Sequence, residues 1–109
     1  MDIDDVDVIV QPKTIIEVKK PRRYSVVFHN DDITPQDFVI YILQEQFDKL
    51  YDEATRLMEL VHSAGSAIVS VYTREIAEQK ASDTMDQAKN FDFPLKVTAE
   101  IYDGDEEND

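Results

Sequence analysis

Five side chains in this sequence are of types that bind or transform other molecules: His29, Asn30, Asp31, Asp32 and His62. The first four are consecutive and separate the apolar run YSVVF from the sequence ITPQDF. Amide oxygens, carboxylates and imidazole nitrogens all accept hydrogen bonds. Adjacent carboxylates repel each other until a cation arrives, so this group suits a primary ammonium. Because His62 follows Met58 and Val61 on one helical stretch, the ammonium is expected to belong to an apolar residue.

Other interpretations of these residues stay open at this point. Asn-Asp-Asp before a helix is ordinarily a turn, in which Asp32 would only brace the loop. Both histidines, with Asp31 and Asp32, are also acceptable Zn²⁺ ligands and would predict a metal-dependent hydrolase, although no His-x-x-x-His spacing accompanies them. The chain has no cysteine, which excludes disulfides, thiolate metal sites and a cysteine nucleophile.

Hydrophobic spacing predicts the elements that position these residues. Strands are expected at residues 24–29, 66–72 and 95–101. Helices are expected at about residues 34–47, 52–64 and 73–90, where apolar residues recur at helical spacing. Their apolar stripes are Phe38, Val39, Ile42, Leu43 and Phe47, then Ala54, Leu57, Met58, Val61 and Ala64, then Ile76, Ala77, Lys80, Ala81, Thr84, Met85 and Ala88.

Local signals mark the ends of these helices. Thr34 can cap the first helix by accepting a hydrogen bond from the Asp37 amide, and Pro35 suits the first helical position. Gly65 lies just past the second helix, where a left-handed backbone costs little for glycine. Thr73 is expected to cap the third helix.

The element order is therefore β-α-α-β-α-β. A strand-helix-strand crossover should make the second and third strands parallel to each other. The first strand then fits between them, antiparallel to both. With three helices covering one face, we expect an α/β two-layer sandwich, that is, an α+β fold with a three-stranded sheet.

Length and charge bound the rest of the molecule. At 109 residues the chain is expected to form one domain at residues 23–101, preceded by a flexible arm at 1–22 and followed by an acidic disordered tail at 102–109. The net charge of −13 disfavours direct binding to nucleic acids and anionic membranes. It also supports an alternative hypothesis, an acidic inhibitor or nucleic-acid mimic that occupies a basic partner. The acidic start MDIDDVD is unlike a signal peptide, so a cytoplasmic location is expected.

The stretches YSVVFHNDDITPQDFVIYILQ, EATRLMELVHSAGSAIVSVYTREIAEQKA and FPLKVTAE resemble the ClpS adaptor family. Four motifs carry the resemblance in order: N-D-D-x-T-P at a helix start, M-x-x-V-H at a helix end, T-x-E-x-A-E-x-K, and a late P-L. The resemblance implies a monomeric adaptor without a cofactor or enzymatic activity. Such adaptors bind proteins whose first residue is bulky and apolar (Leu, Phe, Tyr or Trp) and deliver them to a ClpA-type AAA+ unfoldase and its ClpP peptidase.

The resemblance also implies roles for individual residues. Asn30, Asp31, Asp32 and His62 would contact or orient the α-amino group of the substrate. The pocket for the first side chain would be lined by Ile33, Thr34, Gln36, Val39, Met58, Val61 and Leu95. The unfoldase would contact Glu75, Glu78 and Lys80, and the arm at 1–22 would engage it during delivery. Gln36 departs from the family, which usually has a methionine there that excludes β-branched first residues.

Overall fold

The structure is a computed structural model that describes residues 21–104. Its elements are β1 (Arg23–His29), α2 (Gln36–Phe47), α3 (Tyr51–Ala64), β2 (Ser66–Thr73), α4 (Arg74–Asn90) and β3 (Lys96–Ile101). This order confirms the predicted β-α-α-β-α-β sequence of elements. The predicted arm and acidic tail fall outside the described residues, except for positions 21–22 and 102–104. Tyr102 donates its main-chain N–H to the carbonyl oxygen of Arg23 at 2.9 Å.

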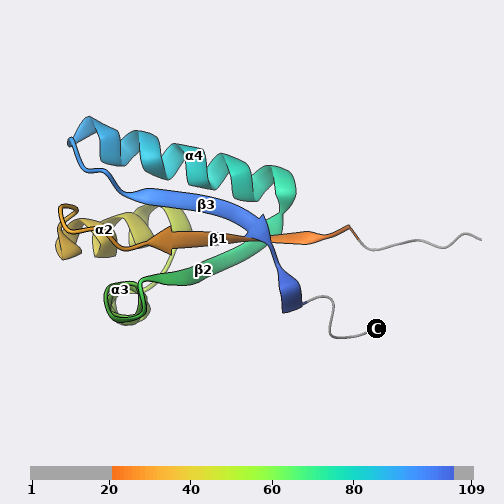
Figure 1. The fold of residues 1–109 in the computed structure, drawn as a ribbon, viewed down its shortest axis with the longest axis horizontal. Helices are drawn as coiled ribbons and strands as arrows, with labels where there is room; N and C mark the ends of the chain where they lie inside the picture. The colour runs from red at the N-terminus through yellow and green to blue at the C-terminus, as the bar shows by residue number, and fades with distance from the viewer. Residues whose placement is uncertain (1–20, 105–109) are drawn as a thin grey trace, which may run out of the picture.

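The three strands form one sheet in the order β2-β1-β3, with β1 antiparallel to both neighbours (Figure 1). Phe28 pairs with Ala67 on one side and with Val97 on the other. The register against β2 shifts between Val26 and Val27. The central position of β1 confirms the predicted topology, and it places the end of this strand between the starts of the other two.

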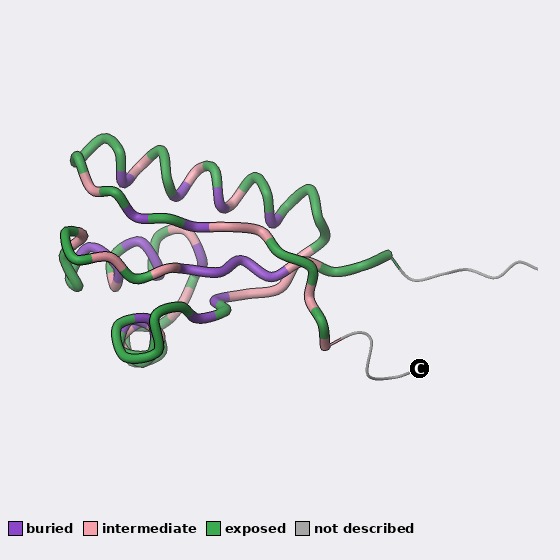
Figure 2. Tube along the Cα trace, in the orientation of Figure 1, coloured by how far each residue is buried: buried purple, intermediate pink, exposed green. Residues whose placement is uncertain are grey.

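Helices cover only one face of this sheet in the described chain. Val26 and Phe28 point into the core that α2, α3 and α4 share, whereas Ser25 and Val27 alternate with them onto the opposite face. In Figure 1, α2 lies behind the sheet while α4 and α3 flank it, and Figure 2 shows burial along β1 and the inner sides of the helices. The two-layer architecture is therefore as predicted.

The helices bury narrower stripes than their sequences predict. All five predicted residues of α2 are buried, but Ala64 of α3 is exposed. On α4 the buried positions are Ala77, Ala81, Thr84 and Ala88. Small side chains let this helix approach the sheet closely, so the flanking Ile76 and Met85 lie beyond the contact and stay exposed. These two larger residues share the predicted helical stripe but do not belong to the core.

Candidate functional site

A main-chain hydrogen bond brings the loop after β1 to the end of α3. The N–H of Asn30 donates to the carbonyl oxygen of Gly65 at 2.9 Å. Gly65 itself has φ of 92° and donates its N–H to Val61 at 2.9 Å, which confirms the predicted left-handed cap. Because His62 lies in the last turn of α3, this bond places Asn30 and His62 at the same end of the molecule.

Asp31 holds the loop together through three hydrogen bonds. Its Oδ1 accepts the main-chain N–H groups of Ile33 at 2.8 Å and Thr34 at 2.6 Å, and its Oδ2 accepts the Thr34 hydroxyl at 2.8 Å. The loop brace is thus Asp31, whereas the turn interpretation had assigned that part to Asp32. The predicted cap by Thr34 is wrong: α2 has Pro35 at its N-cap without a side-chain hydrogen bond, because the Thr34 hydroxyl is directed to Asp31.

These bonds also change the acidity of Asp31. Partial burial acts to raise the pKa of its carboxyl, but hydrogen bonds from Thr34 and Ile33 outweigh this effect and hold the pKa below its ordinary value. The carboxylate of Asp31 is therefore the form that the loop stabilises. Both of its oxygens accept hydrogen bonds within the loop, two on Oδ1 and one on Oδ2.

The other three predicted amine-binding residues are open to solvent. Asn30, Asp32 and His62 are all exposed, and the Asn30–Gly65 bond holds the two segments that carry them side by side. They offer an amide oxygen, a carboxylate and an imidazole nitrogen from the loop after β1 and the last turn of α3, the two segments that this bond joins. Such a group of acceptors can receive hydrogen bonds from an ammonium.

The predicted pocket residues divide into a buried set and a rim. The buried set belongs to the hydrophobic core and consists of Val39, Met58, Val61 and Leu95. The rim contains Ile33 and Gln36, which are exposed, and the half-buried Thr34. The rim residues lie in the braced loop and at the start of α2, whereas the buried set comes from α2, α3 and the segment before β3.

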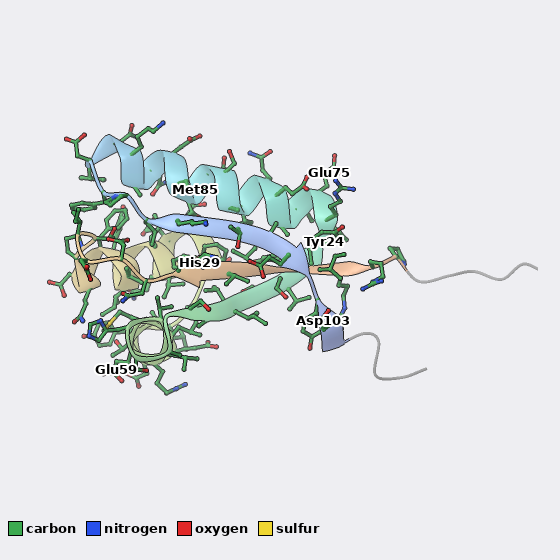
Figure 3. The ribbon with its side chains drawn as sticks, viewed as in Figure 1. Tyr24, His29, Glu59, Glu75, Met85 and Asp103 are labelled. Carbon is green, nitrogen blue, oxygen red and sulfur yellow. The ribbon has the colours of Figure 1, made fainter. Side chains whose placement is uncertain are left out.

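The three residues predicted to contact the unfoldase do not form one exposed patch. Glu75 and Glu78 are exposed, and Glu78 pairs with Arg74 at 3.1 Å. Lys80 instead is half-buried and donates to the carbonyl oxygen of Gln46 at 2.7 Å, which ties α4 to α2. In Figure 3, Glu75 lies at the amino end of α4, at the opposite end of the molecule from the loop after β1.

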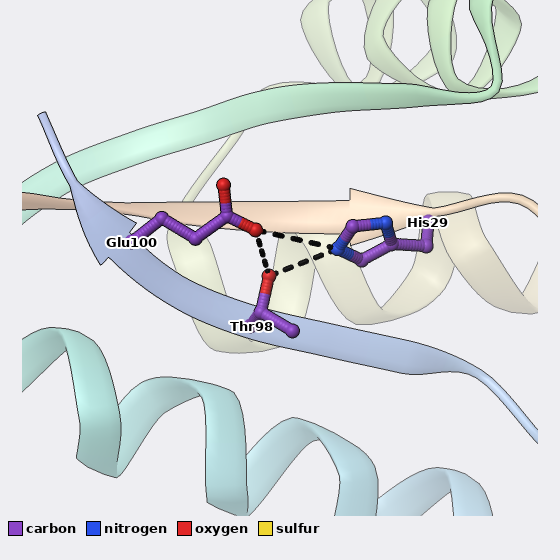
Figure 4. Close-up of polar contacts among 3 residues, drawn as sticks. All are labelled: His29, Thr98 and Glu100. Atoms are coloured by element: carbon purple, nitrogen blue, oxygen red, sulfur yellow. Dashed lines mark hydrogen bonds and ion pairs between the residues drawn. The ribbon is translucent and has the colours of Figure 1, made fainter. Parts of the chain in front are cut away.

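The side chain of His29 does not join Asn30, Asp32 and His62. It lies on the open face of the sheet, where it is hydrogen-bonded to Thr98. Thr98 donates its hydroxyl to Glu100 at 2.6 Å, and the Nε2 of His29 lies 2.9 Å from the Thr98 oxygen (Figure 4). Since the hydroxyl has one proton, Nε2 of His29 must be the donor in the second bond. Within residues 21–104, no three His, Asp or Glu side chains are grouped to hold a metal ion, so the Zn²⁺ hypothesis gains no geometric support.

Three features of this part of the structure were not predicted from the sequence. They are the Asn30–Gly65 bond, the Asp31 brace and the His29–Thr98–Glu100 chain. The spacing of Asp31 and Thr34 is a recognisable signal, because aspartate side chains often accept N–H groups two or three residues ahead. The other two features join distant segments, and the sequence contains no local signal for them.

Comparison with known proteins decides the family. Residues 19–98 match the family model described as "ATP-dependent Clp protease adaptor protein ClpS". The chain belongs to the ClpS adaptor family. The ClpS adapter protein of Caulobacter vibrioides strain NA1000 is 43% identical over 91 residues, which are 84% of this chain and 80% of that protein. The one from Desulfatibacillum aliphaticivorans is 40% identical over 94 residues, 86% of this chain and 88% of that protein.

A solved ClpS structure shares the fold as well. Agrobacterium tumefaciens ClpS2 bound to L-phenylalaninamide superposes with a TM-score of 0.75 at 41% identity, covering 76% of this chain and all of that one. The ClpS fold expected from the sequence is confirmed. This protein is a Clp protease adaptor and not an enzyme. None of the helices in residues 21–104 has the length and apolar character needed to cross a bilayer.

Proposed function

We propose that this ClpS protein binds polypeptides by a free α-amino group and a bulky hydrophobic first residue, and delivers them to a ClpA-type AAA+ unfoldase with its ClpP peptidase. The observation that carries the proposal is the hydrogen bond from Asn30 to Gly65. It holds the loop after β1 against the last turn of α3, so that acceptors from both elements are available to one ammonium. The delivery takes place in the cytoplasm.

The α-amino group is bound by Asn30, Asp32 and His62. Asp32 supplies the negative charge, because its carboxylate is exposed while that of Asp31 is occupied by Ile33 and Thr34. Asp31 acts indirectly by fixing the loop. Support also comes from the A. tumefaciens ClpS2 structure, whose ligand L-phenylalaninamide has a free amino group and an aromatic side chain.

The first side chain packs over the buried set of Val39, Met58, Val61 and Leu95. Hydrogen bonds to a charged group contribute about 1.5–3 kcal/mol each, and burial of a Phe or Leu side chain contributes about 1.5–3 kcal/mol. Association costs on the order of 4–15 kcal/mol. Neither part alone comfortably offsets this cost, so the site requires both the free terminus and the apolar side chain.

Gln36 borders the first side chain where the family usually has methionine. Its side chain is of similar length but ends in an amide, and it is exposed at the rim. We therefore expect Gln36 to contribute to the choice among Leu, Phe, Tyr and Trp as first residues. It should also contribute to the exclusion of Ile and Val. Replacing it by methionine should sharpen the exclusion of Ile and Val in a peptide-binding assay.

The surface that contacts the unfoldase lies on α4. Glu75 and Glu78 present carboxylates one turn apart, and Lys80 holds this helix to the end of α2 through Gln46. The two glutamates would contact the partner directly, and Lys80 would keep the helix in place. Glu75 lies at the opposite end of the molecule from the loop after β1 (Figure 3). A partner bound to this end of α4 would therefore leave the bound substrate accessible.

A titration of labelled peptides tests the proposal. A peptide that begins with Phe or Leu should bind, and the same peptide with an acetylated amino group should not, because acetylation removes the charge and two of the donors. Equal binding of the two peptides would overturn the proposed function.

A further inference from the structure

We propose that a cluster of aromatic rings beside this site, the aromatic patch, binds the residues that follow the first residue of a bound polypeptide, and that it favours an arginine there. The aromatic patch consists of Phe38, Tyr41, Phe91 and Phe93. This inference rests on the proposed function, since it concerns the continuation of a chain whose amino terminus is held by Asn30, Asp32 and His62.

The aromatic patch has a buried base and two exposed rings. Phe38 is 8% exposed, and its ring centroid lies 5.0 Å from Phe93, 5.5 Å from Phe91 and 6.1 Å from Tyr41. The rings of Phe91 and Phe93 are stacked at 6.0 Å. Phe91 is nevertheless 58% exposed and Tyr41 49%. Phe91 leaves more than half of its surface in water, so filling the core does not account for this ring.

The position of the aromatic patch makes it available to a bound chain. Phe38 lies in the first turn of α2, close in sequence to the braced loop, and Phe93 precedes Leu95 by two residues. The loop after β1 and the turn between α4 and β3 lie at the same end of the molecule (Figure 1). An extended chain spans at most about 3.3–3.6 Å per residue. The second to fourth residues of a bound polypeptide therefore stay within about 4–14 Å of its first residue, so they can reach the surface around the loop.

The charges around the aromatic patch select among possible residues. Asp92 separates the two stacked rings in sequence and has φ of 62°. Beside it is a hollow of about 460 Å³, whose lining includes Met85, Phe93 and the carboxylates of Asp86 and Asp92, with Lys89 also present. The whole chain carries a net charge of −13. A glutamate or aspartate would be repelled here.

Arginine matches both features of the aromatic patch. A guanidinium is planar, so it can stack on the exposed face of Phe91 and at the same time pair with a neighbouring carboxylate such as Asp92. Lysine has a positive charge but no planar group that could stack on a ring, and alanine has neither. We therefore expect arginine to be preferred over lysine, and lysine over alanine, at one of the second to fourth positions.

The test compares short peptides that begin with Phe and differ at a single position. Each carries Arg, Lys, Ala or Glu as its second, third or fourth residue, with a fluorophore at the far end, and an acetylated twin accompanies the alanine peptide. The wild-type protein should bind the best arginine peptide roughly threefold to tenfold more tightly than the alanine peptide. In Phe91→Ser this preference should fall below about twofold.

Two further variants separate recognition from folding. Phe91→Leu keeps an apolar side chain but removes the aromatic face, so it should fold normally and also lose the arginine preference. Ile76→Ser is the matched control, because Ile76 is 48% exposed and lies at the other end of α4. It should keep the preference of the wild-type protein.

Each result has a definite consequence. If the free alanine peptide binds and its acetylated twin does not, the amine site stands. An arginine preference that is absent, or unchanged in both Phe91 variants, then overturns this inference alone. Loss of unfoldase binding in Phe91→Leu, with the arginine preference intact, would assign the aromatic patch to the partner and also overturn it. Equal binding of the acetylated twin would overturn the proposed function and this inference together.

Discussion

The main-chain N–H of Asn30 donates a 2.9 Å hydrogen bond to the carbonyl oxygen of Gly65. Asn30 follows the central strand, and Gly65 ends α3. The bond continues the pairing of His29 with Ser66 by one more step beyond the sheet. It therefore fixes the loop that carries Asp32 relative to the helix that carries His62, and the proposed amine site depends on this alignment.

Gly65 should tolerate asparagine better than alanine. Its φ of 92° is unfavourable for residues with a Cβ, although an added Cβ would meet no atom within 4 Å. Gly65→Ala should therefore lower the free energy of unfolding by about 1–2 kcal/mol through backbone strain alone. Gly65→Asn should lose less, because asparagine adopts left-handed conformations more readily. Urea denaturation measures both, and equal losses would contradict the strain explanation.

Asp31→Ala should loosen the loop without removing an amine ligand. It takes away the acceptor for the Ile33 and Thr34 amides and for the Thr34 hydroxyl. We expect a loss of about 0.5–1.5 kcal/mol in stability for each bond that water does not replace, and weaker peptide binding. Asp31→Asn keeps an acceptor oxygen for the two amides and should recover most of both losses. Binding and thermal unfolding should be measured on the two variants in parallel.

The contribution of Asp31 to stability should disappear in acid. Its folded-state pKa is lowered, with burial opposing and the hydrogen bonds from Thr34 and Ile33 producing the shift. A lowered pKa means that the contribution is complete above the unfolded value of about 3.9 and is lost as the pH falls through the folded value. The stability difference between wild type and Asp31→Ala should thus be constant near neutral pH and shrink below about pH 4. A difference that grows on acidification would refute this assignment.

Asp32→Asn and His62→Ala should weaken peptide binding while leaving the fold intact. Both side chains are exposed, so we expect little change in the free energy of unfolding. Each loses a hydrogen bond to a charged group, about 1.5–3 kcal/mol, which corresponds to roughly a tenfold to hundredfold weaker affinity. Fluorescence anisotropy with a peptide that begins with Phe measures this loss. The exposed Asp52, on the first turn of α3, provides the control Asp52→Asn, which should bind normally.

Thr98→Val should break the hydrogen-bond chain on the open face of the sheet. Valine has nearly the shape of threonine but cannot donate to Glu100 or accept from His29. We expect a loss of about 0.5–1.5 kcal/mol in the free energy of unfolding, and Thr98→Ser should restore part of it. In NMR spectra, the His29 ring signals should move in Thr98→Val. Unchanged ring signals would show that His29 does not donate to Thr98 in solution.

The sequence by itself determined the order of the elements, the central position of β1 and the left-handed cap at Gly65. These follow from alternating or helical spacing of apolar residues and from the preference of glycine for positive φ, which are properties of short segments. The four motifs also indicate the family without reference to the tertiary structure. Asp31 and Asp32, by contrast, are identical as residue types, and no local pattern separated a brace from a free carboxylate.

Only the tertiary structure decided which of the two carboxylates, Asp31 or Asp32, accepts hydrogen bonds within the loop. It also decided which side of each helix packs into the core. The hydrogen bonds of Asp31 depend on the path of the loop, and that path is anchored to Gly65 in a different element. Ile76 and Met85 fit the helical stripe yet stay exposed, because the small residues of α4 set how closely it approaches the sheet. Phe91 meets Phe38 only when α4 and α2 pack together. Spacing along the chain specifies which residues share a helix face, whereas the docking of elements specifies what that face touches.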